Sequence, residues 1–383
     1  MYDVIISGAG PAGAVAATVL ARGGARVLLV DRARFPRDKL CGDTMNPGTI
    51  ALLKRLGLTA AFGSWALQVD GMIVTGERGV RVSAAYAGAA RGMAMLRRDL
   101  DAALVRAAEA SGARVEEGVL VRGPLLDSDS DSEEARVRGV VLAGRDGKDL
   151  RVPAPLVIAA DGRRSRLALA LGLTRHPRRP RRWAVGAYFE GVTAVTSFGE
   201  MHVRRDQYVG VARVPSGLTN VCLVSSHHEG LDDPSGTLRR AIDGDEELRD
   251  RFTRARMVTS PVVLGPLAVD AAVAGAPGLL LAGDAAGFID PMTGDGLRFA
   301  VRGGELAATV ALAAFAGRCA APHTRLARVR RREFAGKWRF NRALRRMVDR
   351  GVTVELAGMV ASAAPWILRR TIAYAGDVPR PAE

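Results

Sequence analysis

Four short runs of consecutive apolar residues are spread along the chain, and each is followed closely by a glycine or an aspartate. Uninterrupted apolar runs of this length are typical of strands in a parallel sheet that is covered on both faces. They occupy residues 4–6, 27–30, 155–160 and 279–282. An alanine-rich, helix-forming run at 14–21 lies between the first two runs. The chain therefore opens with a strand, a helix and a strand, which is typical of an α/β fold.

Regular alternation of apolar and polar residues is found in other parts of the sequence. It covers residues 71–86 and then four segments, which are 184–189, 200–204, 208–214 and 220–224. A period of two predicts antiparallel strands with one face in the core and one face in water. Between the two sets of strands, the pattern predicts a helix over 95–111 and a single strand over 115–121. We expect a second sheet inserted between the strands of the first.

These patterns divide the chain into three parts. A chain of 383 residues is too long for one ordinary core. The expected fold class is α/β, with a discontinuous Rossmann-like domain, an α+β second domain built on an antiparallel sheet, and a basic helical C-terminal region. The expected bounds are 1–70, 95–175 and 265–320 for the first, 71–94 and 176–264 for the second, and 321–383 for the third.

The turn after the first apolar run carries the spacing G-x-G-x-x-G. In a dinucleotide site, Gly8 allows a tight turn, Gly10 lets the backbone approach a pyrophosphate, and Gly13 lets the helix pack close to the sheet. The free N–H groups of the helix then face the phosphates. Asp31 ends the second strand, where a carboxylate can accept hydrogen bonds from ribose hydroxyls. The expected nucleotide contacts at this turn also include Pro11, Ala12 and Arg32.

Composition and charge narrow the function classes. The net charge is +15, and arginines cluster at 178–182 and 325–350, but no nucleic-acid recognition motif accompanies them. We expect a solvated basic surface, or a peripheral contact between the C-terminal helices and an anionic membrane, and no nucleic-acid partner. The three cysteines form no metal or disulfide pattern, and the acidic run at 127–134 lacks the residues of a calcium loop, so no metal is expected. Without a signal peptide or a membrane-spanning run, a cytoplasmic location is expected.

Three further motifs follow the glycine turn in order. The first begins at Arg97 and continues through Leu100, Asp101 and Leu104, with Arg98 as the rival arginine. The second is Asp161-Gly162, and the third starts at Gly283-Asp284. Asp284 stands at a strand end, where a carboxylate can accept a hydrogen bond from a ligand hydroxyl. Glycines ahead of the helix at 297–316 leave open space and expose N–H groups that can stabilise negative charge.

Together the four motifs resemble the FAD-dependent oxidoreductases of the aromatic-hydroxylase class, the group A flavin monooxygenases. That class also contains geranylgeranyl reductases and flavin halogenases. The resemblance covers residues 1 to about 310 and implies FAD as cofactor, with NAD(P)H or another electron donor bound transiently. The residues that it implies for FAD binding beyond the glycine turn are Arg97, Asp161, Gly162, Gly283, Asp284, Pro291, Gly294, Asp295, Gly296 and Leu297.

Two segments resemble the geranylgeranyl-reductase branch in different degrees. The loop at 36–43 is similar to its P-R-x-K-x-C-G segment, which implies that Lys39, Cys41 and Gly42 lie near FAD and that Cys41 is a candidate catalytic residue. A small packed residue is the alternative for Cys41. The strand from Tyr208 departs from that branch's Y-x-W-x-F-P, because Gly210 replaces the tryptophan. The candidate substrate-pocket residues are Tyr208, Gly210 and His202.

The leading hypothesis is an NAD(P)H-driven monooxygenase of a lipophilic or aromatic small molecule. The resemblance implies that such a reaction runs through a flavin C4a-hydroperoxide protected from water. The first alternative is a flavin-dependent reductase of C=C bonds that resembles the geranylgeranyl reductases, and the cysteine-glycine loop favours it. The second is a non-catalytic flavoprotein or a protein that binds lipid surfaces.

Overall fold

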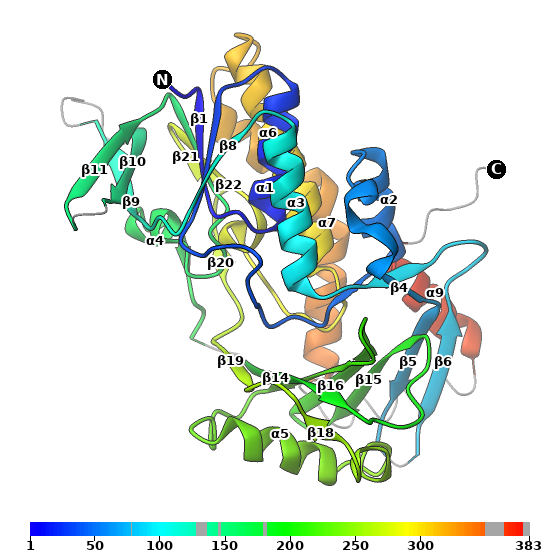
Figure 1. Cartoon of the computed structure of the whole chain (residues 1–383). Coiled ribbons are helices and arrows are strands. Elements are labelled where there is room, and N and C mark those ends of the chain that lie inside the picture. Colours follow the sequence, from blue (N-terminus) through cyan, green and yellow to red (C-terminus); the bar gives the residue numbers. More distant parts are fainter. Residues whose placement is uncertain (78, 128–135, 145–146, 179–181, 349–363, 378–383) are drawn as a thin grey trace.

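A six-stranded sheet forms one half of the molecule (Figure 1). The computed structural model describes residues 1–77, 79–127, 136–144, 147–178, 182–348 and 364–377. The sheet order is β21-β22-β12-β1-β2-β8, and only β21 is antiparallel to its neighbour. The strand bounds are Val4–Ser7 for β1, Val27–Asp31 for β2, Arg114–Glu117 for β8, Leu156–Ala159 for β12, Gly275–Ala276 for β21 and Leu279–Leu281 for β22. All four apolar runs predicted as parallel strands are therefore confirmed.

Alternate residues of the parallel strands point into two separate cores. Val4 and Ile6 face a helical layer, whereas Ile5 faces the opposite side of the sheet. The helical layer consists of α1 (Pro11–Arg22), α3 (Arg97–Ala110) and α6 (Gly296–Phe315). The other side is covered by α4 (Arg166–Ala170) and a three-stranded sheet of β9 (Val121–Leu126), β10 (Val137–Ala143) and β11 (Asp149–Pro153). The sheet is thus buried on both faces, as uninterrupted apolar strands require.

The single strand predicted over 115–121 is wrong. β8 ends at Glu117, and Val121 begins β9 in a different sheet. Gly118 separates them with φ +73°, a left-handed conformation that glycine adopts without steric cost and that interrupts an extended strand. The acidic run falls almost wholly in 128–135, which lies outside the described residues.

The second large sheet has eight strands in the order β18-β14-β17-β16-β15-β5-β6, with β19 also paired to β14. The bounds are Gly71–Thr75 for β5, Arg81–Ala85 for β6, Trp183–Glu190 for β14, Phe198–Arg204 for β15, Gln207–Arg213 for β16, Thr219–Ser225 for β17, Arg256–Met257 for β18 and Val262–Leu264 for β19. The expected strands are present. The sheet is mixed rather than antiparallel throughout, because β5 and β15 run parallel.

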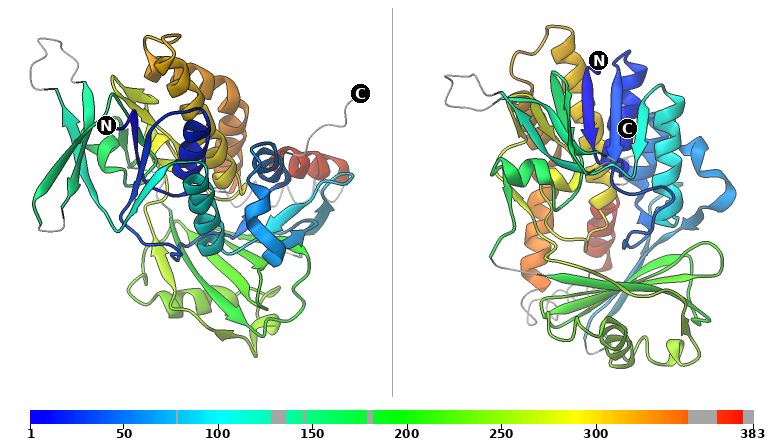
Figure 2. Two further views of the ribbon diagram at one scale, coloured as in Figure 1. Left: turned by 45° about the horizontal axis from the view of Figure 1, so that its top comes forward. Right: turned by 60° about the vertical axis from the view of Figure 1, so that its left-hand side comes forward.

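The expectation that one face of this sheet contacts water is also wrong. Helix α5 (Pro234–Asp243) and the short helix η2 (Asp250–Phe252) lie across the outer face (Figures 1 and 2). Phe189 from β14 packs there among Leu238, Ile242 and Phe252. Residues 233–252 are mostly polar, so the sequence pattern did not indicate that this segment is amphipathic. Its buried apolar residues are few but large.

Smaller elements connect the two halves. β3 (Thr44–Met45), β7 (Gly92–Ala94) and β4 (Leu67–Val69) form a three-stranded sheet, and β13 (Thr174–Arg175) pairs with β20 (Asp270–Ala271). Helix α2 (Pro47–Arg55) starts at an Asn46 cap, and η1 (Thr59–Trp65) follows it. The short helix η3 (Gly283–Ala286) follows β22.

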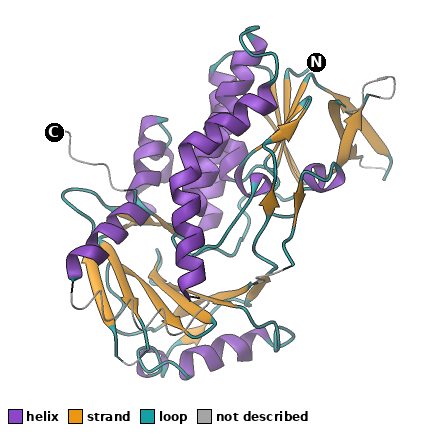
Figure 3. Cartoon of the chain, turned by 180° about the vertical axis from the view of Figure 1, so that it is seen from behind, coloured by secondary structure: helices purple, strands orange, loops and turns teal. Residues whose placement is uncertain are grey.

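Two helices confirm the helical C-terminal region where it is described. Helix α7 (Pro322–Val348) packs against α6 and reaches the second sheet (Figure 3), and α9 (Pro365–Ala375) lies beside β6. Lys337 of α7 fixes the two helices to the body, because its ammonium group donates to the carbonyls of Tyr374 (2.6 Å) and Ala375 (3.0 Å) and to Asp295 (3.2 Å). Residues 349–363 and 378–383 of the predicted tail lie outside the described residues, and the domain bounds stay a prediction.

Candidate functional site

The turn between β1 and α1 has the close packing that the glycine spacing predicts. Gly8 adopts φ +97°, and a Cβ atom there would lie 2.5 Å from the carbonyl oxygen of Ala160. A Cβ atom at Gly13 would lie 1.8 Å from the carbonyl oxygen of Gly8. Gly10 is different, because its nearest neighbour would be Arg37 Nη2 at 3.6 Å. Two glycines are therefore needed for packing, and the third leaves open space in front of the helix.

A cavity of about 720 Å³ begins at this turn and continues between the two halves of the molecule. That volume lies in the range of small-molecule and cofactor sites, roughly 300–1,000 Å³. One wall comes from the half of the molecule that contains the six-stranded sheet. It is formed by Gly10, Pro11, Ala12, Lys39, Arg97, Gly162, Arg163, Gly283 and Asp284. A second wall comes from the loop at 40–46 and the segment at 291–297. The rest is an apolar surface from the second sheet and the C-terminal helices.

Two helix N-termini open onto this cavity without side-chain caps. Helix α1 starts after Gly10 and helix α6 after Asp295. At neither position does a side chain of the cap residue accept a hydrogen bond from an N–H group of the helix. Beside α6, a Cβ atom at Gly294 would meet nothing within 4 Å, and one at Gly296 would meet only the Phe288 ring at 3.7 Å, so the chain leaves space there. Uncapped N–H groups with partial positive charge suit a pyrophosphate at one helix and a polarised carbonyl edge at the other. The residues present therefore fit FAD.

Arg97 lies in the cavity wall although it is almost fully buried, with 6% of its surface exposed. Its guanidinium forms two hydrogen bonds of 3.0 Å to Asp101, which also pairs with Arg37 at 3.1 Å. Burial disfavours the charge, but Asp101 outweighs it, so the pKa of Arg97 is raised and the cation persists. The rival Arg98 is exposed instead. Lys39 also lines the cavity, and burial together with Arg97 lowers the pKa of its ammonium group.

Cys41 and Gly42 line the same cavity as Arg97, and their contact with FAD stays a prediction. Arg97 interacts directly with the Cys41 side chain. Pro291, Gly294, Gly296 and Leu297 form the facing part of the wall. The two loops that the sequence placed near a flavin ring are thus brought to one cavity.

Six of the expected nucleotide contacts do not line the cavity. Gly8 and Gly13 act through packing, and the Asp31 carboxylate accepts hydrogen bonds from the N–H groups of Ala9 (2.7 Å) and Ala33 (2.8 Å). Asp161 accepts from the N–H group of Arg166 at 3.1 Å. Asp295 faces Lys337 at 3.2 Å, and Arg32 is exposed. That these residues contact the cofactor stays a prediction.

Tyr208 and Gly210 of β16 line the cavity from the second sheet. The Tyr208 hydroxyl donates to Asp290 at 2.8 Å, and Arg182 donates to the other oxygen of that carboxylate at 3.2 Å. The Tyr208 hydroxyl is therefore hydrogen-bonded to a buried Arg182–Asp290 ion pair. A Cβ atom at Gly210 would have only backbone neighbours at 3.8 Å or beyond, so glycine does leave extra room there.

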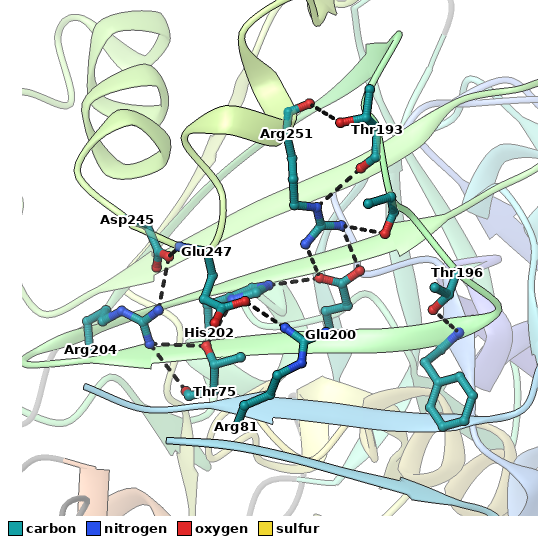
Figure 4. A network of polar contacts seen from close by, with 12 residues as sticks. Thr75, Arg81, Thr193, Thr196, Glu200, His202, Arg204, Asp245, Glu247 and Arg251 are labelled. Atoms are coloured by element: carbon teal, nitrogen blue, oxygen red, sulfur yellow. Dashed lines mark hydrogen bonds and ion pairs between the residues drawn. The ribbon is translucent and has the colours of Figure 1, made fainter. Parts of the chain in front are cut away.

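His202 does not belong to the cavity. It lies on the outer face of β15, fully buried, with Nδ1 at 2.9 Å from Thr75 Oγ1 and Nε2 at 3.0 Å from Glu200 Oε2. Figure 4 shows this network beneath η2, where Arg251 binds Glu200 through two hydrogen bonds. A lone histidine in an alternating strand gives no indication of which face it occupies, and its partners come from distant segments.

A buried polar cluster behind the cavity wall was not assigned from the sequence. Asp43 is buried behind the Cys41–Gly42 wall and accepts hydrogen bonds from Tyr188 and Asn220 of the second sheet. Asn220 itself lines the cavity. An asparagine inside an otherwise apolar strand was the one signal that could have identified this group.

The fold and the cavity define a flavoprotein of the dinucleotide-binding type. The chain belongs to the FAD-binding-domain family, because the family model described as "FAD binding domain" matches residues 1–320. It is an FAD-dependent oxidoreductase. Within its described residues, no helix is long and apolar enough to cross a membrane.

Curated relatives match over most of the chain. A menaquinone reductase of Mycolicibacterium smegmatis is 31% identical, covering 80% of this chain and 75% of its own length. Digeranylgeranylglycerophospholipid reductase 2 of Methanopyrus kandleri is 30% identical, covering 81% and 76%. Among solved structures, a geranylgeranyl bacteriochlorophyll reductase-like protein of Thermoplasma acidophilum has a TM-score of 0.80 at 23% identity, covering 94% and 91%. A flavin-dependent brominase has a TM-score of 0.84 at 19% identity, covering 98% and 94%. These two structural likenesses support the fold.

Proposed function

We propose that this protein reduces C=C bonds in a lipophilic isoprenoid substrate. The observation that carries the proposal is the apolar part of the cavity lining, which the second sheet and the C-terminal helices contribute. Its surface is aliphatic and aromatic, and includes Met72, Val74, Val80, Val82, Tyr86, Met201, Val203, Phe340, Leu344 and Ile372. A surface of this kind gains free energy by removing a hydrocarbon chain from water, at about 25 cal/mol per Å². Two relatives above with at least 30% identity are reductases by name, which supports this reading over hydroxylation.

The protein's own contribution is to bind and orient. Gly10 to Ala12 and the α1 N-terminus would hold the pyrophosphate of FAD, and Asp284 a ribityl hydroxyl. The α6 N-terminus would hold the polarised edge of the ring. When bound and reduced, FAD supplies two electrons to the substrate. The Cys41–Gly42 wall and the β16 strand would confine the substrate between them and exclude water, and NAD(P)H or another donor would restore the reduced cofactor.

An anaerobic assay tests this function. FAD-loaded protein is reduced with dithionite under argon and freed of excess dithionite before menaquinone is added. After the quinone ring has been reoxidised in air, the product is expected to remain heavier by two hydrogen atoms, as measured by mass spectrometry, because air reverses quinol formation but not reduction of a C=C bond. Substituting Gly210→Leu should lower turnover at least about tenfold, because the side chain fills open cavity space, while FAD content is retained. Gly123→Leu is the matched control, since a Cβ atom at Gly123 on β9 meets nothing within 4 Å and Gly123 does not line the cavity.

The monooxygenase alternative gives the opposite outcome. It requires turnover only in air and a product heavier by one oxygen atom. That result, with no product under argon from either menaquinone or a geranylgeranyl lipid, would contradict the reductase proposal.

We also infer that the C-terminal helices dock on an anionic membrane surface. Exposed arginines recur on α7 at intervals of three, four and seven residues, which places them on one helical stripe. They are Arg325, Arg328, Arg332, Arg339, Arg342 and Arg346. The same helix contributes Phe340, Ala343 and Leu344 to the cavity wall, and Ala343 is also exposed. The basic stripe thus runs beside the place where a lipid chain would enter.

Neutralising the end of the stripe beside the cavity should weaken membrane binding. The triple variant R339Q/R342Q/R346Q is expected to bind phosphatidylglycerol vesicles about 100-fold more weakly, because each arginine near an anionic surface contributes about 1 kcal/mol. Vesicle co-sedimentation measures this. The control R249Q/R254Q/R256Q removes three exposed arginines near η2 and β18 and should bind like wild type. Equal losses in both triple variants would indicate a general effect of charge and contradict the docking surface.

A further inference from the structure

Asp43 joins the two halves of the molecule directly behind the cavity wall. It is 1% exposed and has φ +53°, a left-handed conformation that is uncommon for non-glycine residues, although aspartate adopts it more readily than most. One carboxylate oxygen accepts from the Tyr188 hydroxyl (2.5 Å) and from Asn220 Nδ2 (2.7 Å). The other accepts from the N–H group of Arg97 at 3.1 Å. Elements β14, β17 and α3 therefore meet at a single carboxylate.

Asn220 connects this carboxylate to the wall that faces the cavity. Its Nδ2 group donates both to Asp43 and to the carbonyl oxygen of Cys41, at 2.9 Å. Cys41, Gly42 and Asn220 all line the cavity, whereas Asp43 does not. Asn220 thus forms a bridge between the Asp43 carboxylate and the Cys41–Gly42 segment. The bridge is complete only when one oxygen of Asp43 accepts the hydrogen bonds from both Tyr188 and Asn220.

Opposing effects act on the pKa of the Asp43 carboxyl group. Burial raises the pKa of its carboxyl to about 6, and the hydrogen bond from Tyr188 and the charge of Arg97 oppose that rise. The other titratable groups around it are Tyr188 from β14, Cys222 from β17 and Cys41 from its own loop. Burial raises the pKa values of both Tyr188 and Cys222, the latter to about 12, so these two side chains remain neutral near pH 7.

The ionised carboxylate accepts hydrogen bonds from all three groups at once. The Arg97 N–H group and Asn220 Nδ2 can only donate, and the Tyr188 hydroxyl, which can also accept, donates here. A proton on that carboxyl would have to occupy the oxygen shared by Tyr188 and Asn220, or the oxygen bound to Arg97. At least one of the three donors would then lose its acceptor, and a buried unpaired donor costs about 1–3 kcal/mol. Protonation therefore favours release of one of the three elements.

We propose that Asp43 is a positioning residue whose ionised form holds the Cys41–Gly42 segment against the second sheet and thereby sets the geometry of the cavity wall beside the cofactor. Above the Asp43 pKa the bridge through Asn220 is complete. Below it the bridge opens and the wall moves. This inference deepens the proposed function. The effect of the wall position on C=C reduction rests on the proposed function, whereas the positioning itself depends only on FAD binding.

Two spectroscopic readouts test the proposal without turnover. The carboxyl pKa is followed by NMR of protein labelled with ¹³Cγ-aspartate, and the surroundings of the flavin ring by visible circular dichroism of the FAD-loaded protein, both between pH 5 and 8. In wild type we expect one Asp43 resonance and the flavin signal to titrate with a shared midpoint near 6. Asp43→Asn should remove both transitions. Tyr188→Phe should move both to higher pH, because it removes a hydrogen bond that favours the ionised form.

A matched variant separates positioning from a general effect of losing a buried phenol. Tyr208 lies in the same sheet as Tyr188, and Tyr208→Phe removes a comparable hydroxyl that binds Asp290. This variant should leave both midpoints unchanged. A flavin signal that is independent of pH in wild type, or that keeps its midpoint in Tyr188→Phe, would overturn the proposal. Absence of C=C reduction with both titrations intact would overturn the proposed function and leave the positioning role in place.

Discussion

Gly13→Ala is expected to destabilise the FAD-free protein by at least about 3 kcal/mol and to abolish FAD binding. The new methyl carbon would lie 1.8 Å from the carbonyl oxygen of Gly8 and 3.3 Å from the Ala160 Cβ atom. Gly8 belongs to the β1–α1 turn and Ala160 to the adjacent strand end, so neither neighbour can move without separating helix α1 from the sheet. Urea unfolding of the FAD-free protein measures the first effect, and fluorescence titration with FAD the second.

Gly10→Ala provides the comparison. Its methyl group would meet nothing closer than 3.6 Å, at the end of the flexible Arg37 side chain. The FAD-free protein should therefore unfold within about 1 kcal/mol of wild type. FAD affinity should still fall at least about tenfold, because the methyl group occupies the space through which the backbone would approach the pyrophosphate. Wild-type stability in Gly13→Ala, or wild-type FAD affinity in Gly10→Ala, would contradict these roles.

Arg251→Ala is expected to lower the free energy of unfolding by about 3–5 kcal/mol at pH 7, because it leaves the buried Glu200 carboxylate without its cation. Arg251 binds both oxygens of Glu200, at 2.7 and 2.8 Å, and the remaining partner is His202 at 3.0 Å. Burial alone would raise the pKa of Glu200, but hydrogen bonds from His202 and Arg251 lower it. Urea unfolding measures the loss.

The pH dependence of this variant has a defined sign. Without Arg251, burial should raise the Glu200 pKa above its ordinary value of 4.5, so the folded variant binds a proton more readily than its unfolded chain. Its stability deficit should therefore be largest at pH 7 and should shrink as pH falls towards 4.5. Arg256→Ala is the control, since that arginine forms an equally short 2.7 Å pair with Glu190 on the surface and should cost at most about 1 kcal/mol. Equal losses in the two variants would show that burial does not govern the effect.

The first half of the candidate site was predictable because its chemistry is local. Gly8, Gly10 and Gly13 act within one turn, and the helix that follows presents its N–H groups wherever the turn is formed. The Gly283-Asp284 motif is local in the same sense, since a strand end and its following turn lie within a few residues. Both motifs line the cavity or shape its wall without help from distant side chains.

The sequence by itself determined the parallel strands, the glycine turn, the FAD family and the basic C-terminal helices, because these follow from local periodicity and short motifs. Only the tertiary structure decided which face of β15 holds His202, that α5 covers the outer face of the second sheet, and that Asp43 meets Tyr188 and Asn220. The physical reason is that burial and hydrogen-bond partners are set by segments that fold together from different parts of the chain, as for Asp43 and Asn220 with a separation of 177 positions. A polar residue in a strand has the same local pattern whether it lines a cavity, pairs within a core or faces water.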